Sequence, residues 1–97
     1  MKSYYVYILS NKNHTVFYTG MTSNLLQRIY DHKDAQIIGF TKKYNCHNLL
    51  WFEEFDDPVT AIEYEKRIKK WSRKIKFDII TRMNPEWKDL AEDILLE

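Results

Sequence analysis

Two short β-type segments joined by a tight polar turn constrain the fold of this chain more than any other feature. Residues 4–10 are mostly aromatic or β-branched and alternate between two faces, which is typical of a strand. Residues 15–21 form a second such segment, and Asn11–His14 between them supplies residues that favour a turn. We therefore expect an antiparallel β-hairpin. Gly20 lies where the second strand leads into a helix, so it should permit close backbone packing or an unusual dihedral angle.

The segment after this hairpin predicts a helix over about residues 23–34. Thr22 or Ser23 can cap it, because a hydroxyl group there accepts a hydrogen bond from an early helical N–H. Arg28 and His32 are four residues apart, so both lie beside the apolar stripe of the helix and point towards the second strand. The alternative is a solvated helix edge on which neither side chain has a partner.

Later signals predict one more strand and three more helices. Residues 48–55 are apolar enough to form a strand that lies centrally or is covered on both faces. The Asp57-Pro58 pair is typical of a helix start, and Ser72 can cap a further helix. The Asn84-Pro85 pair should start a last short helix. The apolar positions expected to pack in these helices are Ala61, Tyr64, Ile68, Trp71, Ile75, Ile79, Ile80, Trp87, Leu90, Ile94 and Leu95.

We predict a single α+β domain over residues 1–97, with helices packed on a three-stranded antiparallel sheet. The motif-bearing core spans about 4–83 and a short helical tail about 85–96, and residues 35–46 should form a loop. Cys46 is the single cysteine, which excludes an internal disulfide and suits a small buried thiol in a reducing compartment. Without a signal peptide, lipidation motif or long apolar run, the protein is expected to be soluble and cytoplasmic, with no membrane partner.

The net charge of +1 hides a strong separation of acidic and basic segments. Residues 53–65 hold six acidic groups and no base, whereas residues 66–82 hold eight basic groups and one acid. Such a run is usually a solvated helix face. Here Trp71 and Phe77 interrupt it, so it also suits a surface that faces nucleic-acid phosphates. The candidate contacts are Lys66, Lys69, Lys70, Arg73 and Lys74.

Glu65 is an acidic residue at a position where the helical pattern predicts an apolar one, between Ala61 and Ile68. Burying an unpaired carboxylate costs several kcal/mol, so an inward one normally has a partner, a metal or a raised pKa. One explanation is a salt bridge, for which Arg28 is a candidate. The other is a single carboxylate ligand for Mg²⁺, an ion that keeps most of its waters in proteins.

Taken in order, these residues resemble the pattern of the GIY-YIG nuclease family. The pattern consists of the tripeptides Tyr5-Val6-Tyr7 and Tyr18-Thr19-Gly20, then Arg28, His32 and Glu65. The segments Glu65–Trp71 and Asn84–Leu90 look like those of the small stand-alone bacterial branch of this family, and the likeness spans about Tyr4 to Leu90.

The chain departs from the family pattern at three positions. Tyr5 stands where the family name has glycine, and Thr19 where it has isoleucine or valine. Neither side chain is catalytic in the family, although Tyr5 could narrow the cleft. The terminal asparagine of the family maps loosely onto Asn84, which could instead cap the last helix.

The resemblance implies a metal-dependent phosphodiesterase, that is, an endonuclease that acts on nucleic acid. DNA is the expected substrate rather than RNA, and DNA repair or recombination is the expected process. Glu65 would hold Mg²⁺ or Mn²⁺, and Arg28 would contact the same phosphate. Tyr7 and Tyr18 would orient or deprotonate the attacking water, and His32 would relay its proton or hold the phosphate. We find no element that reads bases, so structure-directed or non-specific cutting is expected.

Two other functions remain open at this point. The fold could bind nucleic acid with little or no cleavage, in which case Lys69, Lys70 and Arg73 would control affinity. A protein-interaction module is the second alternative, in which the acidic, apolar tail over residues 87–96 docks on a partner or on its own basic helix.

Overall fold

The computed structural model describes residues 2–33 and 44–95, and for His32, Lys33 and Leu95 it describes the backbone alone. Along these residues run β1 (Tyr4–Ser10), β2 (Phe17–Thr22), α1 (Leu25–Lys33), β3 (Asn48–Phe55), α3 (Pro58–Lys70), α4 (Arg73–Met83) and α5 (Ala91–Leu95). The α+β class and the antiparallel sheet are as predicted, and β3 has the predicted bounds. The loop predicted over residues 35–46 lies largely outside the described residues. No helix among those described is long and apolar enough to cross a membrane.

β1 lies in the middle of the sheet, and β2 and β3 pair with it antiparallel on either side. The hairpin turn is organised by Asn11, whose side-chain oxygen accepts hydrogen bonds from the N–H groups of Thr15 (2.8 Å) and Val16 (3.1 Å). Of the two placements predicted for the third strand, the central one is wrong, because β3 forms an edge of the described sheet. Its first half is covered on both faces, since Leu49 and Leu50 are fully buried in different clusters.

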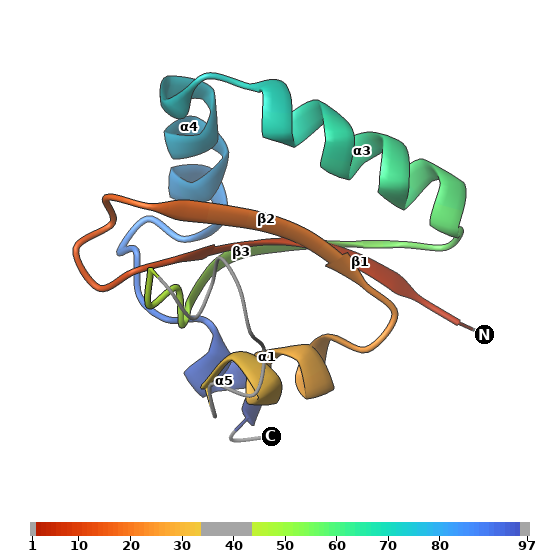
Figure 1. Ribbon diagram of the computed structural model, residues 1–97, viewed down its shortest axis with the longest axis horizontal. Coiled ribbons are helices and arrows are strands. Elements are labelled where there is room, and N and C mark those ends of the chain that lie inside the picture. Colours follow the sequence, from red (N-terminus) through yellow and green to blue (C-terminus); the bar gives the residue numbers. More distant parts are fainter. Residues whose placement is uncertain (1, 34–43, 96–97) are drawn as a thin grey trace.

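Helices cover both faces of the sheet, with α3 and α4 on one side and α1 and α5 on the other (Figure 1). The buried side chains under α3 and α4 are Val6, Ile8, Leu50, Trp51, Ala61, Ile68 and Ile80. Those under α1 and α5 are Tyr7, Leu9, Leu25, Ile29, Cys46, Leu49 and Ala91. Cys46 is a buried thiol, as predicted, and burial raises its pKa.

The starts of α3 and α4 are as predicted, whereas the cap of α1 differs. Asp57 accepts a hydrogen bond from the N–H of Thr60 ahead of α3, and Ser72 caps α4 in the same way. At α1 the cap is Asn24, whose side-chain oxygen accepts from the N–H of Gln27 at 3.1 Å. The prediction of Thr22 or Ser23 was therefore wrong. The Thr22 hydroxyl instead accepts from the N–H of Asn24 and shapes the turn before the helix.

The last helix begins at Ala91, and the prediction that it starts at Asn84-Pro85 was wrong. The backbone of Trp87 has φ 54°, a left-handed conformation that a right-handed helix cannot contain. Asp89 connects this segment to the sheet, because its carboxylate accepts from the N–H groups of Leu49 (2.9 Å) and Ala91 (3.0 Å). The tail packs in two places. Ala91 is fully buried on the sheet face under α1. Trp87 instead lies against the basic helix α4, where its ring centroid is 4.9 Å from that of Phe77 and its Nε1–H donates to the Thr81 hydroxyl group.

Candidate active site

The site is built on the pair formed by Tyr7 on β1 and Gly20 on β2, which lie directly opposite one another in the hairpin. The Tyr7 phenol lies across Gly20: a Cβ atom at position 20 would be 2.5 Å from the Tyr7 hydroxyl oxygen and 3.0 Å from Cε1 of Tyr18. Only glycine leaves room for the phenol, which is the close-packing role predicted for Gly20. Tyr18 lies on the same face as Gly20, and its ring centroid is 6.3 Å from that of Tyr7.

Three other predicted catalytic residues lie within electrostatic reach of Tyr7. Its side chain is buried, and burial is the main reason that the pKa of its phenol is raised well above the ordinary value. The Tyr18 phenol raises this pKa further, the Arg28 guanidinium lowers it, and the Glu65 carboxylate raises it. The fold therefore brings together side chains from β1, β2, α1 and α3, and Tyr7 keeps its proton in this setting.

The cap of α1 sets the position of Arg28. The first hydrogen bond of the helix runs from the N–H of Arg28 to the carbonyl oxygen of Asn24, at 3.1 Å. Leu25 and Ile29 are buried against the sheet, so the half-buried Arg28 lies beside this apolar stripe, as predicted. His32 follows one turn later on the backbone of α1, but its side chain lies outside the described part of the chain.

Glu65 lies between the fully buried Ala61 and Ile68 on α3, and its side chain is 19% exposed. Its salt bridge is to Lys69, at 3.5 Å, and the predicted pairing with Arg28 is not found among the described residues. Lys69 is four residues further on the same helix and is 53% exposed. Exposed pairs of this kind stabilise a helix by only about 0.3–0.5 kcal/mol, so the carboxylate can readily exchange Lys69 for another cation.

The Glu65 carboxylate suits a hydrated divalent ion that is held by a single carboxylate. No group of three or more His, Cys, Asp or Glu side chains within residues 2–33 and 44–95 is arranged to hold a metal ion. Mg²⁺ does not need such a cage, because it keeps several waters and uses one or two carboxylates together with substrate phosphates. Glu65 is partly exposed and lies within electrostatic reach of the Tyr7 phenol, so it can serve as such a single carboxylate.

Asn84 has a structural role that explains its burial. It is 2% exposed and ends α4, where its N–H donates to the carbonyl oxygen of Ile80 at 2.7 Å. Its side-chain amide donates to the carbonyl oxygens of Leu50 (3.2 Å) and Lys88 (2.7 Å), and its side-chain oxygen accepts from the N–H of Lys88. Asn84 therefore caps the end of α4 and not, as predicted, the start of the last helix.

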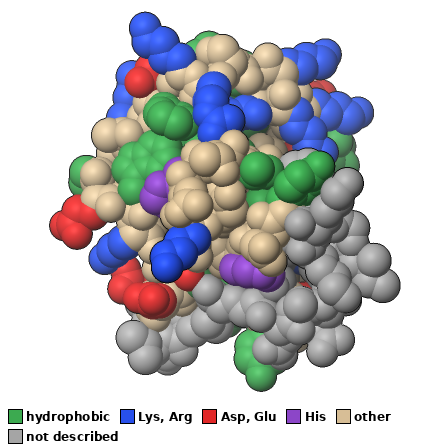
Figure 2. All heavy atoms as spheres, turned by 60° about the vertical axis from the view of Figure 1, so that its left-hand side comes forward, with side chains coloured by type: hydrophobic (Ala, Val, Ile, Leu, Met, Phe, Trp, Pro, Cys, Tyr) green, Lys and Arg blue, Asp and Glu red, His purple; other side chains and the backbone are tan. Residues whose placement is uncertain are grey.

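The five predicted nucleic-acid contacts are all exposed, on α3 and α4. In Figure 2, several Lys and Arg side chains lie towards the top of the view, near hydrophobic side chains. Arg73 has a second role that sequence analysis missed: its guanidinium donates to the carbonyl oxygens of His14 (2.9 Å) and Thr15 (2.7 Å). The same group lies 4.7 Å from the centroid of the Phe17 ring. Arg73 thus attaches α4 to the hairpin turn, through contacts between residues 58 and 59 positions apart that no local pattern signals.

Comparison with known proteins identifies the family of this chain. The sequence profile of the GIY-YIG catalytic domain matches residues 3–78. A UPF0213 protein of Clostridium perfringens is 33% identical over 92 residues, which cover 95% of this chain and 98% of that protein. A UPF0213 protein of Staphylococcus saprophyticus is 32% identical over 84% of this chain and 98% of its own length.

The same relationship appears among solved structures. The solution NMR structure of a UPF0213 protein from Bacillus halodurans matches the fold with a TM-score of 0.57 and 25% identity, covering 90% of this chain and 92% of that one. The domain match covers most of the chain, and the relatives are of nearly equal extent. The chain belongs to the GIY-YIG family of nucleases.

Proposed function

We propose that this protein is a metal-dependent endonuclease that hydrolyses phosphodiester bonds in DNA. The observation that carries the proposal is that the buried phenol of Tyr7 has Tyr18, Arg28 and Glu65 within electrostatic reach. Phosphodiester hydrolysis needs a cationic donor for the phosphate oxygens, a carboxylate for a divalent ion and polar groups that orient water. This cluster contains all three.

Each side chain has a role that follows from its chemistry. Arg28 binds the scissile phosphate, because its planar guanidinium can donate two parallel hydrogen bonds to phosphate oxygens. Glu65 holds Mg²⁺ or Mn²⁺, which when bound offsets the negative charge that develops on the phosphate. Tyr7 donates a hydrogen bond from its protonated hydroxyl group, and together with Tyr18 it orients the attacking water. His32 relays the proton of that water or holds the phosphate.

Exposed lysines of α3 and α4 position the substrate. Lys66, Lys70 and Lys74 are exposed and have no acidic partner in the described parts of the chain. Contacts between such side chains and phosphates release counterions and carry no base sequence information. We therefore assign structure-directed or non-specific cutting to this protein. DNA repair or recombination is the process in which we expect it to act.

The test is cleavage of labelled duplex, single-stranded, branched and nicked DNA, and of RNA, with Mg²⁺, with Mn²⁺ and with EDTA. Arg28→Ala is the test variant, and Arg82→Ala, which removes an exposed arginine at the end of α4, is the matched control. We expect metal-dependent cleavage of DNA by wild type and by Arg82→Ala. Loss of one transition-state donor lowers rates by about 100- to 1,000-fold, which is the loss expected for Arg28→Ala.

Cleavage that is equal in all variants would indicate a contaminating nuclease and contradict the proposal. Salt-sensitive binding without any cleavage would instead favour a nucleic-acid-binding protein. For that reason binding is measured in parallel over a range of salt concentrations, where phosphate contacts predict a slope of about −0.9 in log K against log salt per contact. A protein-interaction role for the tail is not supported, because Ala91 is buried and Leu90 and Ile94 pack on the protein's own core.

A further inference from the structure

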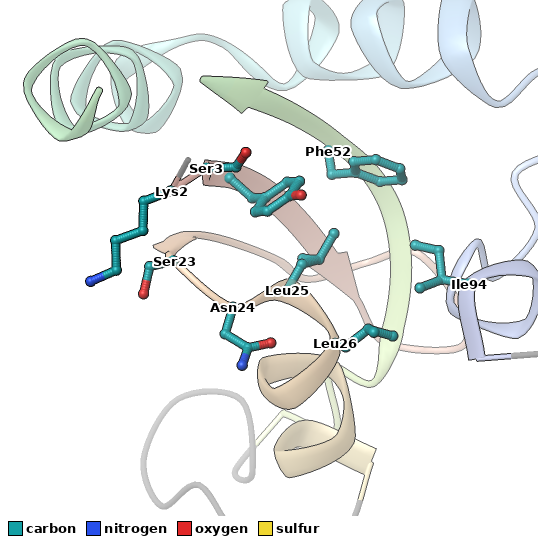
Figure 3. Close-up of a pocket in the computed structure, with 9 residues that line it drawn as sticks. Lys2, Ser3, Ser23, Asn24, Leu25, Leu26, Phe52 and Ile94 are labelled. Carbon is teal, nitrogen blue, oxygen red and sulfur yellow. The ribbon is translucent and has the colours of Figure 1, made fainter. Parts of the chain in front are cut away.

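A cavity of about 520 Å³ lies beside the candidate active site, between the start of β1 and α1. In Figure 3, Lys2, Ser23 and Asn24 lie on one side of it and Phe52 and Ile94 on the other. Its volume falls within the roughly 300–1,000 Å³ range of small-molecule sites. None of the roles assigned above uses this cavity.

The cavity adjoins the position assigned to the scissile phosphate. Tyr5 lines it and lies two residues before Tyr7, so the two rings project from the same face of β1, about 7 Å apart along the strand. Asn24, which caps α1 at the rim of the cavity, precedes Arg28 by about one helical turn, or about 6 Å. A chemical group attached close to a phosphate at Arg28 can therefore reach the cavity.

The lining is apolar and partly aromatic, with polar groups at the mouth. Tyr5 and Phe52 are half-buried, and Leu26, which is 51% exposed, adds an apolar wall that the fold leaves in water. At the mouth, the side-chain oxygen of Asn24 is used by the cap of α1, while its NH₂ group has no hydrogen-bond partner within the described residues. This NH₂ group can donate to a ligand, and Ser23 beside it offers a hydroxyl group.

The aromatic and apolar lining favours a flat, neutral ring as the ligand. The Tyr5 hydroxyl donates to the carboxylate of Glu54 at 3.4 Å, which places a negative charge beside the aromatic wall. Lys2 is the single cation in the lining. A flat neutral ring with polar edges can stack on Tyr5 or Phe52 and accept a hydrogen bond from Asn24.

We propose that this cavity receives one unstacked nucleobase of the substrate strand, next to the phosphate that Arg28 binds. This proposal rests on the nuclease function proposed above and specifies its substrate class: DNA with an unpaired nucleotide beside the cleaved bond, as at a branch, flap or bulge. An unpaired base costs least to unstack, which makes this site a source of structure selectivity. Tyr5, where the family pattern has glycine, supplies an aromatic wall for that base.

The test is a double-mutant cycle on binding, measured in EDTA so that no cleavage occurs. The probe is a branched DNA with one unpaired thymidine at the branch, compared with copies in which each of the nucleotides around the branch in turn is abasic. Ser23→Trp fills the mouth of the cavity, and Ser3→Trp fills it from the β1 side as a second variant. Asn13→Trp is the matched control, because Asn13 is exposed in the hairpin turn at the opposite end of β1.

We expect one abasic position to weaken binding by wild type about 5- to 140-fold, the range that corresponds to loss of one stacked base. Ser23→Trp should weaken binding of the intact DNA by a similar factor and should cause no further loss with the abasic DNA. Asn13→Trp should behave as wild type. Thermal unfolding of each variant is measured to check that the protein remains folded.

Three results would overturn the proposal. If the effect of Ser23→Trp adds to that of every abasic substitution, no base enters the cavity. The nuclease function would still stand in that case, provided that metal-dependent cleavage is observed. A change in oligomeric state in Ser23→Trp, without any dependence on the base, would assign the cavity to a second copy of the chain. Absence of any nucleic-acid binding would overturn the cavity and the nuclease function together.

Discussion

Tyr7 and Gly20 face each other across the hairpin so closely that the phenol lies where a side chain at position 20 would begin. The hydroxyl oxygen of Tyr7 is 2.5 Å from the position of a Cβ atom on residue 20. This pair fixes the phenol above β2, within electrostatic reach of Tyr18, Arg28 and Glu65. The glycine of the motif is therefore required by the packing of a site residue.

Gly20→Ala should impair cleavage while the protein stays folded. The new methyl group must displace the Tyr7 ring, and a displacement of about 1 Å in an active site can lower the rate about 100-fold. Tyr7→Phe, which removes the hydroxyl group and keeps Gly20, is the companion variant. Cleavage rates and thermal unfolding are measured for both. A Gly20→Ala protein with full activity would show that the position of the Tyr7 ring does not matter.

Asn84→Ala should destabilise the fold without changing the chemistry. Its buried side chain makes three hydrogen bonds to the backbone of Leu50 and Lys88, and unsatisfied buried groups cost about 1–3 kcal/mol each. We expect a loss of about 2–4 kcal/mol in the free energy of unfolding, measured with urea. The cleavage rate of the folded fraction should equal that of wild type. A stable variant that has lost cleavage would instead place Asn84 in the catalytic machinery.

Arg73→Lys should weaken the attachment of α4 to the hairpin turn. Lysine keeps the charge but cannot reproduce the planar guanidinium that donates to two carbonyl oxygens and stacks on Phe17. We expect a loss of about 1 kcal/mol in the free energy of unfolding and faster amide exchange in the turn. Lys74→Gln is the control, because it should lower nucleic-acid affinity and leave exchange in the turn unchanged. Equal exchange in both variants would contradict the assigned role of Arg73.

Stability at low pH should depend on the cap of α3. Hydrogen bonds from Thr60 hold the pKa of the Asp57 carboxyl group below its usual value. A depressed folded-state pKa means that this stabilisation is present above the unfolded-state value of about 3.9 and is lost as the pH falls through the folded-state value. In thermal unfolding between pH 7 and pH 3, wild type should therefore lose more stability than Asp57→Asn, whose amide caps at every pH. Parallel curves for the two proteins would contradict this.

Local patterns predicted much of the architecture. Alternation over residues 4–10, the turn residues after them and the Asp57-Pro58 pair each act within a few positions, so the hairpin and the start of α3 follow from them. Glu65 was identified because a carboxylate interrupts an apolar stripe. The resemblance to the GIY-YIG pattern then implied that Arg28 and Glu65 would share a site with the tyrosines, although it could not show which cation pairs with Glu65.

The features that sequence analysis missed depend on tertiary contacts or on competition between similar residues. Thr22, Ser23 and Asn24 are all good helix caps, and only the course of the chain after β2 selects Asn24. The left-handed backbone of Trp87 is unusual for a bulky residue, so the helix predicted after Pro85 could not be excluded from sequence. The role of Arg73 depends on a carbonyl oxygen 59 positions away.

The central claim is that Glu65 acts in metal-dependent cleavage, and single-turnover kinetics of Glu65→Gln test it most directly. The matched control is Glu63→Gln, which removes an exposed carboxylate from the same helix. With saturating enzyme, branched DNA and a Mg²⁺ titration, we predict that Glu63→Gln cleaves as wild type does and that Glu65→Gln cleaves at least about 100-fold more slowly at every Mg²⁺ concentration. Equal rates for the two variants, with Mg²⁺-dependent cleavage retained in both, would contradict the account.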